Sequence, residues 1–112
     1  MISLNGVRMY VSSTDQSGVV DADTTLHFTQ KGSAVFARYS GGNVARGCLV
    51  GALVGSELTF RYAQRETSGD IHGGRSRCDV MQLPDGRACI VEHFTWSTRV
   101  GSGTNVFLET RN

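Results

Sequence analysis

The chain has 112 residues, of which 39% are hydrophobic and 19% charged, and its 11 basic and 10 acidic residues give a net charge of +1. This length allows one hydrophobic core, so we expect residues 1–112 to form a single domain. The composition is too apolar for a disordered tail, and the sequence has no run of about 18 apolar residues that could cross a bilayer as a helix. The near-zero net charge predicts neither a nucleic acid nor a membrane surface as a partner.

The start of the chain and its cysteines indicate a compartment. Residues 1–10 lack a basic start followed by an apolar stretch of roughly 7–15 residues, so the sequence predicts a cytoplasmic protein without a secretory signal. Cys48, Cys78 and Cys89 are odd in number and show no CxxC spacing. This pattern favours free thiols over a disulfide framework or a zinc site, and we expect neither a metal nor a cofactor.

Short apolar-rich runs alternate with turn residues along the chain, which is typical of consecutive antiparallel strands. In chain order, the predicted strands span 6–12, 24–30, 33–39, 43–51, 57–66, 71–83, 86–98 and 103–110. Glycine marks most connections because it reaches positive φ without steric cost, and Pro84 presets the first corner of its turn. Only residues 12–23 form a longer, polar connection, which we expect either to cross one end of the molecule as a lid or to contain a short helical turn.

Eight strands joined by short turns leave two sheet edges, and closing an up-and-down meander into a barrel removes both edges. We therefore predict an all-β fold, a single antiparallel, up-and-down, eight-stranded barrel. A two-sheet sandwich is less favoured because it needs crossover connections, and only residues 12–23 are long enough for one. The interior of such a barrel is filled by side chains or holds one small ligand, so its composition decides between a core and a pocket.

Alternation along strand 86–98 places Glu92 on one face with Ile90, Phe94 and Trp96. If this face points inward, alternation along the other strands places a further set of side chains inside: Tyr39, Tyr62, Gln64, Ser76, Asn105 and Glu109. Each buried polar group must find a hydrogen-bond partner or cost roughly 1–3 kcal/mol, so this mixture is more polar than a core needs. Either these groups satisfy one another in a closed network, or, as we favour for the set as a whole, they line a pocket.

The sequence therefore predicts a barrel that binds a small molecule in a cavity of mixed aromatic and polar character. The predicted ligand-binding residues are Tyr39, Tyr62, Gln64, Ser76, Glu92, Phe94, Trp96 and Glu109. In this interpretation, Glu92 accepts a hydrogen bond from the ligand or pairs with a cation.

Two other functions use the same fold. An enzyme of isomerase, cyclase or lyase type would use Glu92 as its general acid or base and Tyr62 as a proton donor, and Glu109 on the next strand would complete a carboxylate pair. A non-catalytic interaction module would use its outer face or an oligomer interface, which an outward-facing Phe36 favours. The sequence leaves open whether the protein forms a homo-oligomer and whether Arg46 reaches inward to neutralise Glu92.

Six segments carry a resemblance to a known family: Leu26–Gly32, Ala37–Gly42, Gly47–Gly51, Leu58–Tyr62, Leu83–Arg87 and Glu92–Trp96. From about residue 6 to residue 110, the chain is similar to a family of small bacterial proteins that are often labelled N-acetylglutamate synthases. The sequence has neither the helix pattern nor the acetyl-CoA loop of such an acetyltransferase, and the resemblance implies a calycin-type, lipocalin-like barrel. It also implies that Tyr39, Tyr62, Glu92 and Trp96 belong to one shared site.

Two departures from the family pattern fall on the face predicted to point inward. Phe94 stands where the family usually has Trp, and Ser76 and Cys78 stand where its hairpin has Cys and then Ser. The resemblance thus implies the architecture, whereas a reshaped cavity leaves the ligand open.

Overall fold

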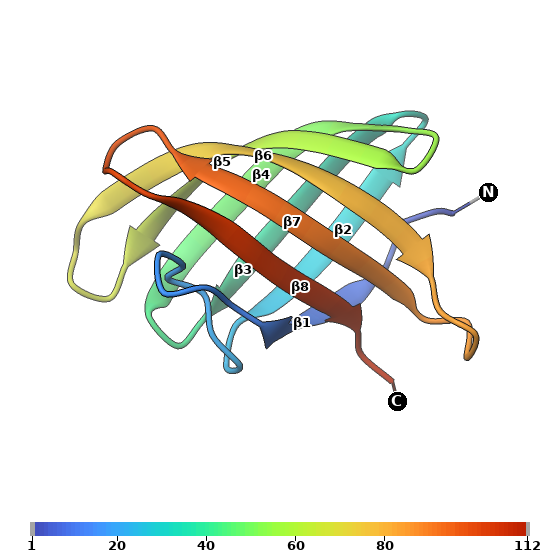
Figure 1. Ribbon diagram of the computed structural model, residues 1–112, viewed down its shortest axis with the longest axis horizontal. Helices are drawn as coiled ribbons and strands as arrows, with labels where there is room; N and C mark the ends of the chain where they lie inside the picture. The colour runs from blue at the N-terminus through green and yellow to red at the C-terminus, as the bar shows by residue number, and fades with distance from the viewer. Residues whose placement is uncertain (1, 112) are drawn as a thin grey trace.

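The computed structural model describes residues 2–111 and confirms the predicted up-and-down barrel. Consecutive antiparallel strands follow one another around the barrel, and β8 pairs with β1 to close it (Figure 1). The strands are β1 (Arg8–Ser13), β2 (Thr25–Lys31), β3 (Ala34–Gly41), β4 (Val44–Val54), β5 (Glu57–Glu66), β6 (Ile71–Gln82), β7 (Ala88–Trp96) and β8 (Ser102–Glu109). The predicted strand boundaries agree with the observed ones to within 3 residues.

The barrel forms because each strand alternates buried and exposed side chains. In β5, Leu58, Phe60, Tyr62 and Gln64 are buried, and the residues between them are exposed. One face of each strand therefore points inward, and closure of the sheet covers that face without a second layer. Gly51 in β4 allows a close approach to β5, since a Cβ atom there would overlap the carbonyl oxygen of Thr59.

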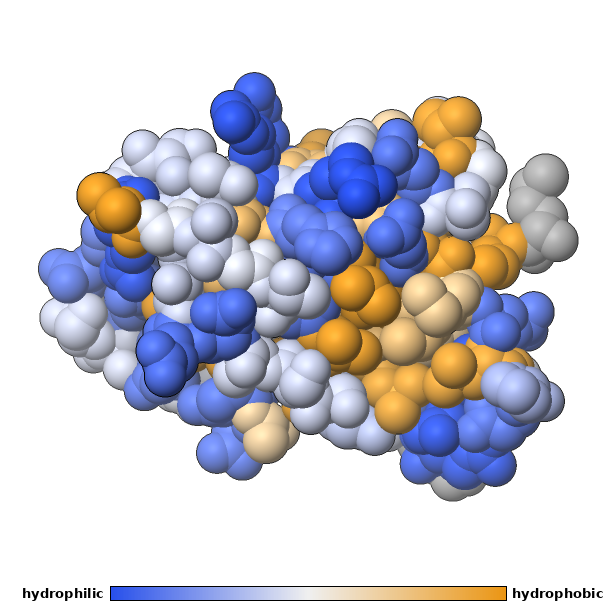
Figure 2. Space-filling model, in the orientation of Figure 1, coloured by the Kyte–Doolittle hydropathy of each residue, from blue (hydrophilic) through white to orange (hydrophobic). Residues whose placement is uncertain are grey.

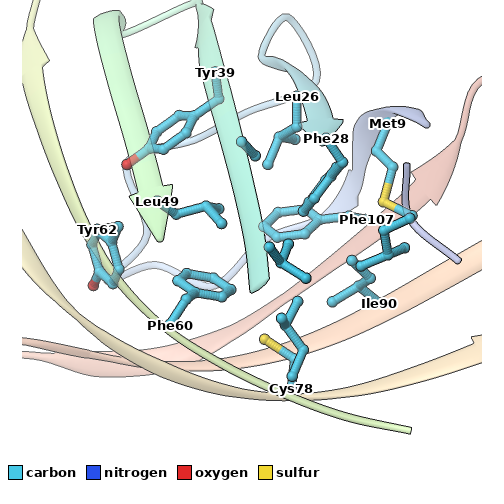
Figure 3. Close-up of a cluster of buried hydrophobic side chains, with 14 of the residues drawn as sticks. Met9, Leu26, Phe28, Tyr39, Leu49, Phe60, Tyr62, Cys78, Ile90 and Phe107 are labelled. Atoms are coloured by element: carbon cyan, nitrogen blue, oxygen red, sulfur yellow. The ribbon is translucent and has the colours of Figure 1, made fainter. Parts of the chain in front are cut away.

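The character of the interior changes along the barrel axis. One half is apolar, and the other half contains most of the buried polar side chains. Figure 3 shows Met9, Phe28 and Ile90 packed together, whereas Tyr39 and Tyr62 stand to one side of this cluster. The segment before β1 covers the apolar end, where Leu4 is fully buried and its N–H donates to Oε1 of Gln30 at 2.8 Å. The polar half is thereby left at the opposite end of the barrel.

The outer surface is mixed in character. Figure 2 shows hydrophilic side chains over much of one face and hydrophobic ones gathered toward the side of the N-terminus. Phe36 is 40% exposed on the outside of β3, the orientation indicated by the sequence. Among residues 2–111, the structure contains no helix long and apolar enough to span a membrane.

Candidate functional site

The polar half of the barrel surrounds a small cavity. The volume of this cavity is about 30 Å³, which is room for roughly two water molecules. Six of the predicted ligand-binding residues line it: Tyr39, Tyr62, Gln64, Glu92, Phe94 and Trp96. Ser76 is also buried in this half, and it reaches the cavity indirectly through a contact with Glu92.

Glu92 on β7 is only 5% exposed and has neutral partners. Its Oε1 accepts a hydrogen bond from Nδ2 of Asn105 at 2.9 Å, and its Oε2 lies 2.6 Å from the Ser76 hydroxyl. Burial raises the pKa of Glu92, and the hydrogen bonds with Ser76 and Asn105 oppose this shift without cancelling it. Within residues 2–111, Glu92 forms no ion pair, and Arg46 is exposed on the outer side of β4.

A second polar network runs along the mouth of the cavity. The Tyr39 hydroxyl donates to Oε1 of Gln64 at 2.9 Å, and Nε2 of Gln64 donates to Glu66 at 3.0 Å. Arg99 ends this series of hydrogen bonds by donating to Glu66 at 2.9 Å. Its guanidinium carbon lies 4.7 Å from the ring centroid of Trp96. Burial works to raise the pKa of Glu66, but the hydrogen bonds from Arg99 and Gln64 outweigh it and lower that pKa. Glu66 and Arg99 therefore neutralise each other.

Tyr62 differs from Tyr39 because its hydroxyl has no partner among residues 2–111. The hydroxyl is buried against Gly74 of β6 and forms no hydrogen bond with any described residue. The ring packs edge to face against Phe60 and Trp96, with centroid distances of 6.1 Å and 5.3 Å. Burial raises the pKa of Tyr62, and the neighbouring charge of Glu92 adds to this shift, so the hydroxyl keeps its proton. Tyr62 thus lines the cavity and carries a buried hydrogen-bond donor that has no acceptor among residues 2–111.

The connection between β1 and β2 covers this end of the barrel. Trp96 donates its indole N–H to the carbonyl oxygen of Ser17 at 2.9 Å, and the Thr14 hydroxyl donates to Oδ1 of Asn105 at 2.6 Å. Three residues of the same loop line the cavity: Gly18, Val19 and Val20. Residues 14–20, which we call the lid, contain turns and no helix. Of the two forms that the sequence left open for this connection, the structure has the lid.

Comparison with known proteins gives one family. A family model described as avidin-like protein matches residues 2–110. The chain belongs to the avidin-like family. Neither a curated protein nor a solved structure gives a significant match. The avidin-like assignment agrees with the calycin-like barrel implied by the sequence resemblance, and it says nothing of an N-acetylglutamate synthase.

Glu109 does not line the cavity of this avidin-like barrel. It pairs with Met9 at the apolar end, where its carboxylate accepts a hydrogen bond from the backbone N–H of Ala88 at 2.8 Å. Glu92 lies opposite Asn105, and Glu109 follows Asn105 by about 13 Å along β8, at a rise of about 3.3 Å per residue. The structure therefore does not bring together the carboxylate pair considered for catalysis.

The site also contains residues that the sequence did not single out. Glu66 lies two residues after Gln64 in β5, so both side chains are on the inner face. Alternation along this strand could therefore have identified Glu66. Arg99 comes from the loop between β7 and β8, where no periodic pattern predicts orientation. Among residues 2–111, no group of three or more His, Cys, Asp or Glu side chains is arranged to hold a metal ion.

Proposed function

We propose that this avidin-like barrel binds one small molecule in the cavity beneath its lid. The observation that supports the proposal is the buried hydroxyl of Tyr62, a residue of the cavity wall, which forms no hydrogen bond with any described residue. A buried hydroxyl without a hydrogen bond costs roughly 1–3 kcal/mol, and a bound molecule that accepts a hydrogen bond from it recovers this cost. Aromatic walls with a few convergent polar groups are also typical of small-molecule sites.

The side chains divide the work of binding between them. Phe94 and Trp96 bury the apolar part of the ligand, Tyr62 donates a hydrogen bond, and Glu92 offers the free lone pairs of its two oxygens. With the lid closed, a cavity of about 30 Å³ admits only a compact group. A larger ligand would have to displace the lid side chains that line the cavity, Val19 and Val20.

Catalysis on the same barrel is the second candidate, and one observation favours it. Burial raises the pKa of Glu92, and general acids and bases work best when their pKa lies near the working pH. However, both oxygens of Glu92 already contact Ser76 and Asn105, and no second carboxylate approaches it within hydrogen-bond distance in residues 2–111. We therefore place binding first. An enzyme would convert a ligand that the cavity binds, and its rate would follow the ionisation of Glu92.

The single tryptophan provides a direct test, because every tryptophan signal comes from the cavity wall. Compact molecules of varied charge, together with biotin as the ligand of streptavidin, are titrated while Trp96 fluorescence and the indole N–H resonance are followed. We expect at least one saturable response, which Tyr62→Phe weakens about tenfold, the equivalent of one lost hydrogen bond.

The matched control is Phe36→Ala, which removes an exposed ring from the outer surface of β3 and should leave binding unchanged. Two results would refute the proposal. One is the absence of any saturable Trp96 response across the panel. The other is binding that survives Tyr62→Phe and disappears in Phe36→Ala, which places the ligand outside the barrel.

A further inference from the structure

We propose that the ligand of this cavity is a compact organic molecule with a cationic amine or guanidinium group, whose positive charge is balanced by the buried carboxylate of Glu92, while another part of the molecule accepts the hydrogen bond from Tyr62. The inference rests on the proposed binding function and names the ligand class. Three features of the site carry it: a buried carboxylate that has no counter-charge within the described part of the chain, a wall of aromatic rings, and a mouth whose Glu66 and Arg99 neutralise each other.

The first feature is the charge of Glu92. A buried carboxylate is costly unless it is paired, and Ser76 and Asn105 supply hydrogen bonds without supplying charge. Arg99 bonds to Glu66 instead, and Arg46 is exposed on the outside. Each oxygen of Glu92 makes one of these hydrogen bonds and keeps a further lone pair. A positively charged ligand would provide both the missing donors and the missing counter-charge.

The second feature is the aromatic wall. Tyr62, Phe94 and Trp96 line the cavity and pack edge to face, with interplanar angles of 71° for Tyr62–Trp96 and 69° for Phe94–Trp96. Aromatic faces carry negative potential and attract ammonium and guanidinium groups. Trp96 already shows this behaviour, because the guanidinium of Arg99 lies over its ring. The aromatic faces and the carboxylate of Glu92 would both repel an anion.

The third feature is the neutral mouth, which leaves Glu92 to determine the charge preference. Three other titratable groups lie near enough to respond to the charge of Glu92: Tyr39 on β3, Tyr62 on β5 and Cys78 on β6. Burial first, and then the charge of Glu92, raises the pKa of each of these groups, so they stay neutral near pH 7. Glu66 is paired with Arg99, and Asp15 of the lid is exposed to solvent.

The pH dependence of binding has a definite sign. Protonation of Glu92 removes the counter-charge, so the affinity for a cation must rise with pH until Glu92 is fully ionised and then level off. Below that point, affinity changes about tenfold for each pH unit, because one proton leaves for each cation bound. His72 packs edge to face against Trp96, with ring centroids 6.3 Å apart, so a variant at this position serves as a control.

The test compares guanidinium with urea, its uncharged counterpart of the same shape, and uses acetate as the anionic control. Each compound is titrated at millimolar concentration and constant ionic strength, and the Trp96 indole resonance is followed between about pH 5 and pH 8. We expect guanidinium to bind about tenfold or more tightly than urea at the upper pH, and this ratio to fall as the pH is lowered. Acetate should not bind.

Two variants assign the effect to Glu92. Glu92→Gln keeps side-chain atoms at both hydrogen-bonding positions, and it should bring guanidinium and urea to within about twofold of each other. His72→Gln should keep both the preference and its pH dependence. If Glu92→Gln does not fold, the pH dependence in the His72→Gln background carries the test by itself.

The outcomes separate this inference from the proposed function. If urea or another neutral compound binds as tightly as guanidinium, the barrel binds a ligand but the cation assignment is wrong. A guanidinium preference that persists in Glu92→Gln, or that follows His72, also overturns the assignment. If no compound of any charge changes the Trp96 signal, the binding function itself fails, and the cation assignment fails with it.

Discussion

The two tyrosines that line the cavity can be compared directly, because both are buried and their hydroxyls differ in one hydrogen bond. The Tyr39 hydroxyl donates to Gln64 at 2.9 Å, whereas the buried Tyr62 hydroxyl has no partner within residues 2–111. Tyr62→Phe removes an unpartnered polar group and keeps the ring contacts with Phe60 and Trp96. Since such a group costs about 1–3 kcal/mol, we expect the free energy of unfolding of the ligand-free protein to rise by roughly 1–2 kcal/mol.

Tyr39→Phe should have the opposite effect. It leaves Oε1 of Gln64 buried without a donor, and the free energy of unfolding should fall by about 1–3 kcal/mol. Urea unfolding followed by circular dichroism measures both changes, and each kcal/mol corresponds to about 4 °C in Tm for a domain of this size. If Tyr62→Phe destabilises the protein as much as Tyr39→Phe does, the Tyr62 hydroxyl is hydrogen-bonded in the folded state. The argument that gives the cavity a ligand would then be refuted.

Three further predictions concern the cavity and its frame. Because burial raises the pKa of Glu92 above its value in the unfolded chain, its contribution to stability is complete below about pH 4.3 and is lost as the pH rises through the folded-state pKa. Glu92→Gln should therefore gain stability relative to the natural chain as the pH rises, and parallel plots of unfolding free energy against pH would contradict this. Gly51→Ala places a methyl group against the Thr59 carbonyl oxygen and should cost about 1–3 kcal/mol in thermal melts, so an unchanged Tm would show that the strands can separate there freely. Trp96→Phe removes the N–H that donates to Ser17, and hydrogen exchange should accelerate in the lid but not at the apolar end; equal rates in both proteins would mean that this bond does not hold the lid.

The sequence by itself determined the strands and the direction in which their side chains point. Strand 57–66 has the boundaries of β5, and Glu92 and Trp96 lie inside on the face that their alternation indicated. These features are local, because side chains alternate with a period of two residues and turn residues act within a few positions of the chain. The short connections also favoured an up-and-down order, from which the closed barrel follows.

Only the tertiary structure decided which inward-facing residues meet. Alternation predicts that Glu92 and Glu109 both point inward, but they lie in different halves of the barrel. Arg99 joins the site from a loop. The lid and the different partners of Tyr39 and Tyr62 likewise depend on which strands and loops come to lie across the cavity. Strand register, barrel stagger and loop path set these meetings, and they depend on contacts between residues far apart in the chain, which the alternation within one strand does not encode.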